Sequence, residues 1–167
     1  MTEQPQTLQF DIQKIYLQDV SLESPNAPVV FTRDNLAPEL DVQINISHQE
    51  LDGDNGFYNV VLEVTVTATE GEHTIFLIEV HQAGVFRIVN IKESELPLAL
   101  EVAAPNVLLP FAREAVSDLA GKGGFPQLLI NPVNFEALYQ QHHNKSNGAG
   151  DKEVQISTGD EAAEDQN

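Results

Sequence analysis

The stretch YNVVLEVTVTA, residues 58–68, alternates apolar and polar side chains over most of its length. Because successive side chains of a β-strand point to opposite faces, this period of two predicts a long strand with one buried and one solvated face. The positions expected to point inward are Tyr58, Val60, Leu62, Val64, Val66 and Ala68. A half-solvated strand is typical of an antiparallel sheet.

The segments before and after this strand predict two antiparallel partners. Residues 40–47 alternate in the same way, and the Asp-Gly and Asn-Gly pairs within 52–56 predict a turn between the two strands. A second turn at Glu70-Gly71-Glu72 leads into residues 73–91, where both faces are apolar. We therefore expect something to cover the second face of this later strand.

Two irregularities are expected in the sheet. Gly84 interrupts the run 73–91 and predicts a bulge, because a glycine inside a strand pattern often marks one. The apolar residues between positions 8 and 22 slip in phase along the chain. This slip predicts that the first strand is kinked or carries a bulge.

Helix signals occur only in the second half of the chain. Ser94 predicts the start of a short helix, which Pro105-Asn106 is expected to break. Asn106 is then expected to cap a longer helix that runs through Leu119 and stops at Gly121. Strands followed by helices predict one α+β domain with an antiparallel sheet.

The longer helix carries an apolar surface that is wider than one core-facing stripe requires. Two interpretations stay open: a deeply buried helix in a monomer, or a helix shared between subunits. The pair Asn131-Pro132 predicts a final, shorter helix that ends near His143. We expect a flexible N-terminus over 1–7, a folded domain over 8–144 and an acidic, flexible tail over 145–167.

The chain is strongly acidic. Its 26 acidic and 8 basic residues give a net charge of −18, and removing residues 145–167 still leaves 20 acids and 6 bases, a charge of −14. Such a surface repels nucleic acid and anionic membranes, so neither is an expected partner. It suits a cationic polypeptide partner, although solubility alone explains the charge equally well.

Cysteine is absent, which excludes disulfides and thiolate chemistry and is compatible with the cytoplasm. The polar N-terminal residues predict no signal peptide, and the most apolar stretch, 97–112, is too short and too interrupted to span a membrane. We therefore expect a cytoplasmic protein that does not insert directly into a membrane.

No catalytic motif is found: nucleophile elbows, phosphate loops and dinucleotide fingerprints are all missing. His73 and His81 share a strand face, but eight residues separate them, which is too far for both to bind one ion directly. Asp52 and Asp54 lack calcium-loop spacing and are interpreted as turn residues. We expect no catalytic residue, no metal and no cofactor, although an enzyme with a small-ligand pocket stays a rival interpretation.

Several strings together resemble the SecB protein-export chaperone family. The match covers roughly residues 8–140. The strings that carry it are Ile15-Tyr16 with 24–28 (SPNAP), 60–66 (VVLEVTV), 76–80 (FLIEV), 82–86 (QAGVF), 104–114 (APNVLLPFARE), 125–128 (FPQL) and 131–138 (NPVNFEAL).

The resemblance implies a four-stranded antiparallel sheet followed by a long helix and a shorter C-terminal helix. It implies assembly as a dimer of dimers, a homotetramer with long helices between the sheets. The implied function is ATP-independent holding of unfolded precursor proteins and their delivery to the SecA ATPase for export. A SecB-like chaperone that serves a toxin–antitoxin pair, or other clients unrelated to export, is the alternative.

The resemblance also implies site residues. The resemblance implies that the residues that dock to SecA are Asp19 and Glu23 in the first strand and Leu77 and Glu79 in the fourth. The resemblance also implies that one face of the fourth strand takes part in assembly or client binding. Alternate residues of the strand point to this face. Aromatic side chains are further candidates, because unfolded clients offer mainly apolar surface. The client-binding or assembly set is Phe31, Phe57, Phe76, Ile78, Val80, Gln82, Phe111, Phe125 and Phe135.

Overall fold

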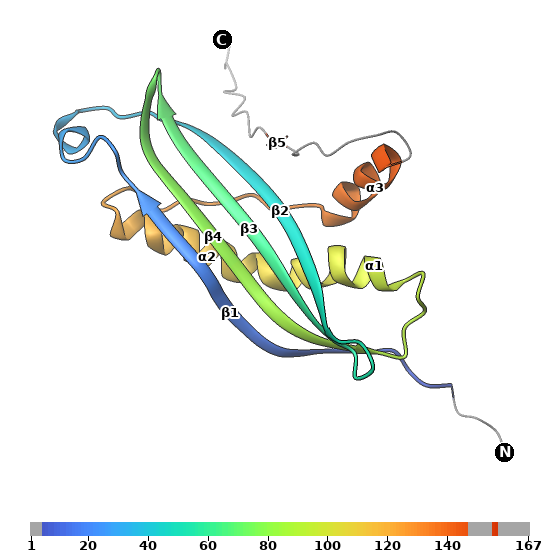
Figure 1. Ribbon diagram of the computed structural model, residues 1–167. Coiled ribbons are helices and arrows are strands. Elements are labelled where there is room, and N and C mark those ends of the chain that lie inside the picture. Colours follow the sequence, from blue (N-terminus) through green and yellow to red (C-terminus); the bar gives the residue numbers. More distant parts are fainter. Residues whose placement is uncertain (1–4, 147–154, 157–167) are drawn as a thin grey trace, which may run out of the picture.

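The computed structural model describes residues 5–146 and the backbone of residues 155–156. Four long strands form one antiparallel sheet in the order β1-β4-β3-β2 (Figure 1). These strands are β1 (Gln9–Glu23), β2 (Glu39–Asp52), β3 (Phe57–Glu70) and β4 (His73–Val89). The α+β prediction with four antiparallel strands is thus confirmed.

The predicted flexible ends fall largely outside this description. Residues 1–4, 147–154 and 157–167 lie outside the described part of the chain. Within the predicted tail, the two-residue strand β5 (Gln155–Ile156) pairs antiparallel with β2 and adds a fifth strand at the sheet edge.

Helices cover one face of the sheet (Figure 1). A 3-10 turn, η1 (Val29–Thr32), connects β1 to β2. After β4 come α1 (Leu96–Leu98), the π-helical turn η2 (Ala99–Ala103), α2 (Ala104–Lys122) and finally α3 (Phe135–Ser146), which packs against η2. Within the described ranges, no helix is both long and apolar enough to cross a membrane.

The expected helix break at Pro105-Asn106 is wrong. The backbone runs from α1 through η2 into α2 without a loop, and the residue before α2 is already helical. Pro105 is the second residue of α2, so its missing N–H falls where the hydrogen-bond pattern changes from π to α. Asn106 therefore lies inside a helix and caps nothing.

The ends of the two longer helices differ slightly from expectation. Helix α2 continues one residue past Gly121, to Lys122. The final helix begins at Phe135 and not at Asn131-Pro132, because the Asn134 side chain accepts a hydrogen bond from the backbone N–H of Ala137 at 3.0 Å. That contact caps the helix start.

The core lies between the sheet and α2. All six side chains predicted to point inward from β3 are buried, and they meet the row Phe76, Ile78 and Val80 of β4. Helix α2 covers these rows with small and aliphatic residues such as Leu108 and Ala112. The alternation of residues 58–68 is therefore confirmed: its apolar positions point into the core and its polar positions point to the other face.

The predicted irregularity of β1 is confirmed, and the predicted bulge at Gly84 is wrong. Register shifts in the β1–β4 pairing fall between Ile12 and Lys14 and between Leu17 and Asp19. Gly84 instead pairs in register on both sides of β4. A Cβ there would lie 2.7 Å from a ring carbon of Phe86 and 3.1 Å from a methyl carbon of Leu108, so the position is small because the Phe86 ring of β4 and Leu108 of α2 both pack closely against it.

Both predicted turns are confirmed. The turn between β2 and β3 is closed by Asp52, whose carboxylate accepts hydrogen bonds from the backbone and side chain of Asn55 at 3.2 and 2.8 Å. The side-chain bond first, and then the backbone bond, lower the pKa of Asp52 below its usual value. In both turns a glycine adopts positive φ, 74° at Gly56 and 58° at Gly71.

The second face of β4 stays partly open. Leu77, Glu79, His81 and Val85 point away from α2 and are half-buried. The expected cover is present in part: Ala83 on this face and Ile75 near the start of β4 are buried, and the Tyr16 hydroxyl of β1 reaches across β4 to donate to the Asn59 side chain of β3 at 2.7 Å.

The tight approach at Gly84 predicts that Gly84→Ala lowers the free energy of unfolding by about 1–3 kcal/mol, because the new methyl group crowds Phe86 and Leu108. Urea unfolding followed by circular dichroism measures this change. Gly121→Ala is the matched control: no atom lies within 4 Å of its Cβ position in α2, so helix propensity should stabilise it by about 0.5–1 kcal/mol. Equal effects of the two substitutions would contradict the packing argument.

Candidate functional site

The four residues predicted on the first and fourth strands lie side by side. In the antiparallel register Glu23 is opposite Leu77, and Asp19 is opposite His81. Directly opposed residues point to the same face of a sheet, so these residues and Glu79 share the face that points away from α2. We call the surface formed by Asp19, Glu23, Leu77 and Glu79 the acidic outer face. Asp19 and Glu23 are exposed, whereas Leu77 and Glu79 are half-buried.

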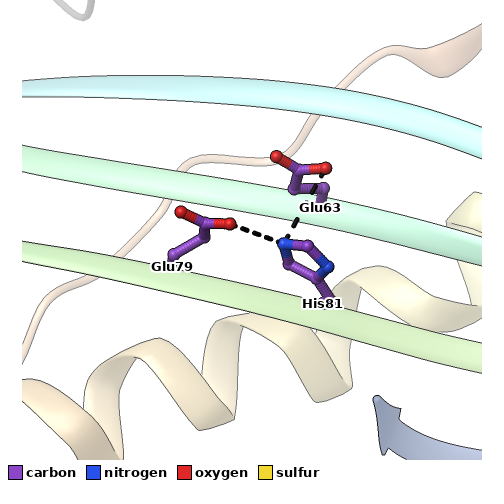
Figure 2. A group of neighbouring side chains, drawn as sticks. All are labelled: Glu63, Glu79 and His81. Carbon is purple, nitrogen blue, oxygen red and sulfur yellow. Dashed lines mark hydrogen bonds and ion pairs between the residues drawn. The ribbon is translucent and has the colours of Figure 1, made fainter. Parts of the chain in front are cut away.

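A histidine joins two carboxylates in the middle of this face (Figure 2). The Nε2 atom of His81 lies 2.7 Å from Oε1 of Glu79 and 3.8 Å from Oε2 of Glu63. Glu79 and His81 are two residues apart on β4, and Glu63 is the cross-strand partner of His81 on β3. The three side chains, which we call the Glu-Glu-His cluster, are 24–39% exposed.

Sequence reasoning missed Glu63 as a member of this cluster. It gave Glu79 a docking role and considered His81 only together with His73, which lies exposed at the start of β4. The outward position of Glu63 follows from the alternation of β3. Which residue of β4 it faces depends on the register between the strands, and the chain pattern alone does not contain that register.

Three of the candidate aromatic residues form a stack. The ring of Phe125 lies 5.4 Å from that of Phe31 and 4.7 Å from that of Phe76, measured between centroids. Phe76 on β4 and Phe125 after α2 are buried, whereas Phe31 in η1 is 51% exposed. The stack therefore has a buried base and an exposed tip.

The other client-binding candidates are not members of this stack, although Ile78 and Val80 continue the buried row of Phe76 on β4. Phe57 is half-buried at the start of β3, opposite Arg87, and Phe111 is 47% exposed on α2. Phe135 is buried at the start of α3. The remaining members of the set are buried on the inner face of β4: Ile78, Val80 and Gln82, whose side chain donates to the backbone carbonyl of Tyr16 at 3.0 Å. The structure does not bring all nine candidates onto one surface.

Strand β1 carries an apolar row that sequence reasoning did not single out. Ile12, Leu17 and Val20 are each opposite a buried residue of β4, yet each is 41–51% exposed. Their pairing places them on the inner side of the sheet, beyond the area that α2 covers. The available signal was the apolar pattern of residues 8–22, in which apolar residues alternate at 8, 10 and 12, then at 15 and 17, and then at 20 and 22. Exposed apolar rows of this kind mark surfaces that bind another protein.

A pocket of about 380 Å³ lies between the helical run and the segment before α3. Val102 and Val133 give it apolar walls, and Asn106 and Glu136 give it polar ones. Among the predicted residues, only Phe135 belongs to its lining. The pocket combines apolar walls with a carboxylate, and its volume is at the lower end of the range of small-ligand pockets.

Comparison with known proteins identifies close relatives of this architecture. The family model described as SecB, preprotein translocase subunit SecB, matches residues 3–146. The protein-export protein SecB of Hydrogenovibrio crunogenus is 49% identical over 145 residues, which cover 87% of this chain and 95% of that protein. The protein-export protein SecB of Chromobacterium violaceum is 50% identical over 141 residues, which cover 84% of this chain and 92% of that protein.

A solved structure shares the fold at much lower sequence identity. It is the SecB-like chaperone Rv1957 of Mycobacterium tuberculosis, in complex with a ChAD peptide from the HigA1 antitoxin Rv1956. The TM-score is 0.62 at 17% identity, and the match covers 74% of this chain and 90% of that chain. At this identity the similarity concerns the fold alone.

Proposed function

The chain belongs to the SecB family of protein-export chaperones, and from this premise we propose that it holds unfolded precursor proteins without ATP and delivers them to the SecA ATPase. The observation that carries the holding step is exposed apolar surface: the Phe31 tip of the aromatic stack and the open row on β1. The relatives at about half identity are protein-export proteins, which supports export as the purpose of binding.

Client binding requires surface that an unfolded chain can use. Such a client lacks a core and presents apolar side chains and unpaired backbone. Phe31 offers a large ring whose position is held by Phe125 beneath it, so little side-chain entropy is lost on contact. No sequence-specific polar site is required, and binding of this type is expected to be broad.

Docking to SecA is proposed for the acidic outer face. Asp19, Glu23 and Glu79 place carboxylates on two neighbouring strands, and Leu77, opposite Glu23, adds an apolar contact at one end of the group. A net charge of −18 adds a field that attracts a basic partner and speeds its association. The attraction is expected to weaken as salt rises, because exposed charges are screened.

We further propose the cytoplasmic homotetramer, a dimer of dimers, that the family implies. The apolar row of β1 and the exposed Phe111 and Leu98 on the helical side leave apolar surface on a single chain. A second copy of the chain that covers part of this apolar surface would remove it from water and so stabilise the assembly. The remainder would stay available for clients.

The alternative, a SecB-like chaperone for a toxin–antitoxin pair, receives less support. The structure with the antitoxin peptide is similar in fold only, at 17% identity. The protein-export relatives reach 49–50% identity over most of the chain. A pull-down from cell extract that recovers an antitoxin but no SecA would favour the alternative.

The holding step predicts that a stoichiometric amount of the purified protein slows folding of a signal-bearing precursor after dilution from denaturant, with no ATP present. Recovery of the precursor's native fluorescence measures the folding rate. The same precursor added in its folded form is the control and should not bind. An unchanged folding rate at several-fold excess of the protein would overturn the holdase proposal.

For the client surface we expect Phe31→Ser to weaken binding of an unfolded precursor by about tenfold, roughly 1.4 kcal/mol, while stability changes by less than about 1 kcal/mol. Calorimetry with the precursor and urea unfolding measure the two effects. Leu51→Ser is the matched control, because Leu51 is equally exposed and lies at the opposite end of the sheet. Phe76→Ala should instead cost about 3–5 kcal/mol of stability, since its ring is buried. If Phe31→Ser binds the precursor like the unchanged protein, Phe31 is not a client contact.

For docking we expect Glu79→Lys to weaken SecA affinity by about tenfold or more, because it reverses a charge in the centre of the acidic outer face. Calorimetry with SecA measures affinity, and light scattering checks that the assembly is unchanged. Glu93→Lys makes the same charge change at an exposed position between β4 and α1 and should have little effect. Equal losses in the two variants would show that only net charge matters and would remove the assignment to this face.

A further inference from the structure

We propose that the Glu-Glu-His cluster is a binding site for a divalent transition metal ion such as Zn²⁺. One ligand atom each from Glu63, Glu79 and His81 lies within 4.8 Å of the others (Figure 2). A mixed imidazole and carboxylate set is a common ligand set for zinc, with bonds of about 2.0–2.2 Å. The cluster shares Glu79 with the face proposed to dock SecA, but metal binding does not depend on the proposed function, because it is tested without client or SecA.

The ligand spacing is close to what a tetrahedral ion needs. Bonds of about 2.1 Å at tetrahedral angles place ligand atoms about 3.4 Å apart. The Nε2 atom of His81 is 2.7 Å from Glu79 and 3.8 Å from Glu63, and the two glutamate oxygens lie within 4.8 Å of each other, so movements of the flexible glutamate side chains by about 1 Å bring the set to this spacing. Three protein ligands leave the fourth position for water or for an atom of a bound partner.

The strands that supply the ligands hold them in a constant geometry. Glu79 and His81 come from neighbouring outward positions of β4, and Glu63 comes from the directly opposed position of β3. Both strands are paired on both edges, so their backbones are among the least free to move in the sheet. A site on interior strands loses less conformational entropy on metal binding than one on a loop.

The surrounding charge favours a cation. Asp19 on β1 is the cross-strand partner of His81, and two glutamates already share this small area. Metal binding requires neutral imidazole and ionised carboxylates, and it would relieve the repulsion between the glutamates. The competing interpretation is a plain ion pair between protonated His81 and Glu79, which would bind no metal.

Titration of the full chain with ZnCl₂ alone, followed by calorimetry, distinguishes the two interpretations. We expect one Zn²⁺ per chain, and His81→Gln and Glu63→Gln should each weaken its affinity by about tenfold or more. The visible absorption of Co²⁺ bound in place of Zn²⁺ should show tetrahedral coordination in the unchanged protein and lose that signature in His81→Gln.

The matched control is His48→Gln. His48 also pairs with a glutamate, Glu101, at 3.4 Å, but it belongs to no three-residue cluster among the described residues. Its substitution should leave the Zn²⁺ affinity unchanged. Absence of saturable binding would overturn the proposal. So would binding that survives His81→Gln but disappears in the double variant His142→Gln, His143→Gln, because the ion would then sit near the end of α3.

Discussion

Strand β4 is hydrogen-bonded on both edges, and its register with β1 and β3 decides what each surface of the protein contains. Phe76, Ile78 and Val80 point to α2, while Leu77 and Glu79 point the other way. A slip by one residue would bury a carboxylate and expose the aliphatic row. Burying an unpaired charge and losing several buried side chains would cost far more than the few kcal/mol that separate folded from unfolded protein.

The same register explains how much of the candidate site the sequence could predict. Alternation alone places Glu63, Glu79 and His81 on outward positions of their strands, and family-like strings single out Asp19 and Glu23. That these side chains meet is a property of strand pairing, which depends on turn geometry and on the bulges of β1. The residues were therefore predictable one at a time, whereas the Glu-Glu-His cluster was not.

For the fold, predictions from short sequence patterns were correct where burial alone decided the local structure. They failed where two physical effects competed. The period of two in residues 58–68 reflects burial alone, and every predicted inward side chain is buried. At Pro105 a helix-breaking residue competes with the burial of apolar residues on both sides of it, and the π-helical turn before it lets the helix continue. At Gly84 the pattern rule for bulges was outweighed by the close packing of the Phe86 ring and of Leu108 from α2. In both cases tertiary packing decided the outcome, and no short window of sequence contains that packing.

A chaperone faces a conflict between stability and binding, because apolar side chains that are left open for clients contribute nothing to its own core. In the aromatic stack the two needs fall on different residues: Phe76 and Phe125 are buried and stabilise the fold, while Phe31 packs on Phe125 and stays half exposed. The acidic charge is expected to act in parallel, because a charge of −14 on residues 1–144 makes separate molecules repel one another despite their exposed apolar rows. Under the proposed function, the high charge would keep the protein soluble while its apolar surface stays exposed for clients.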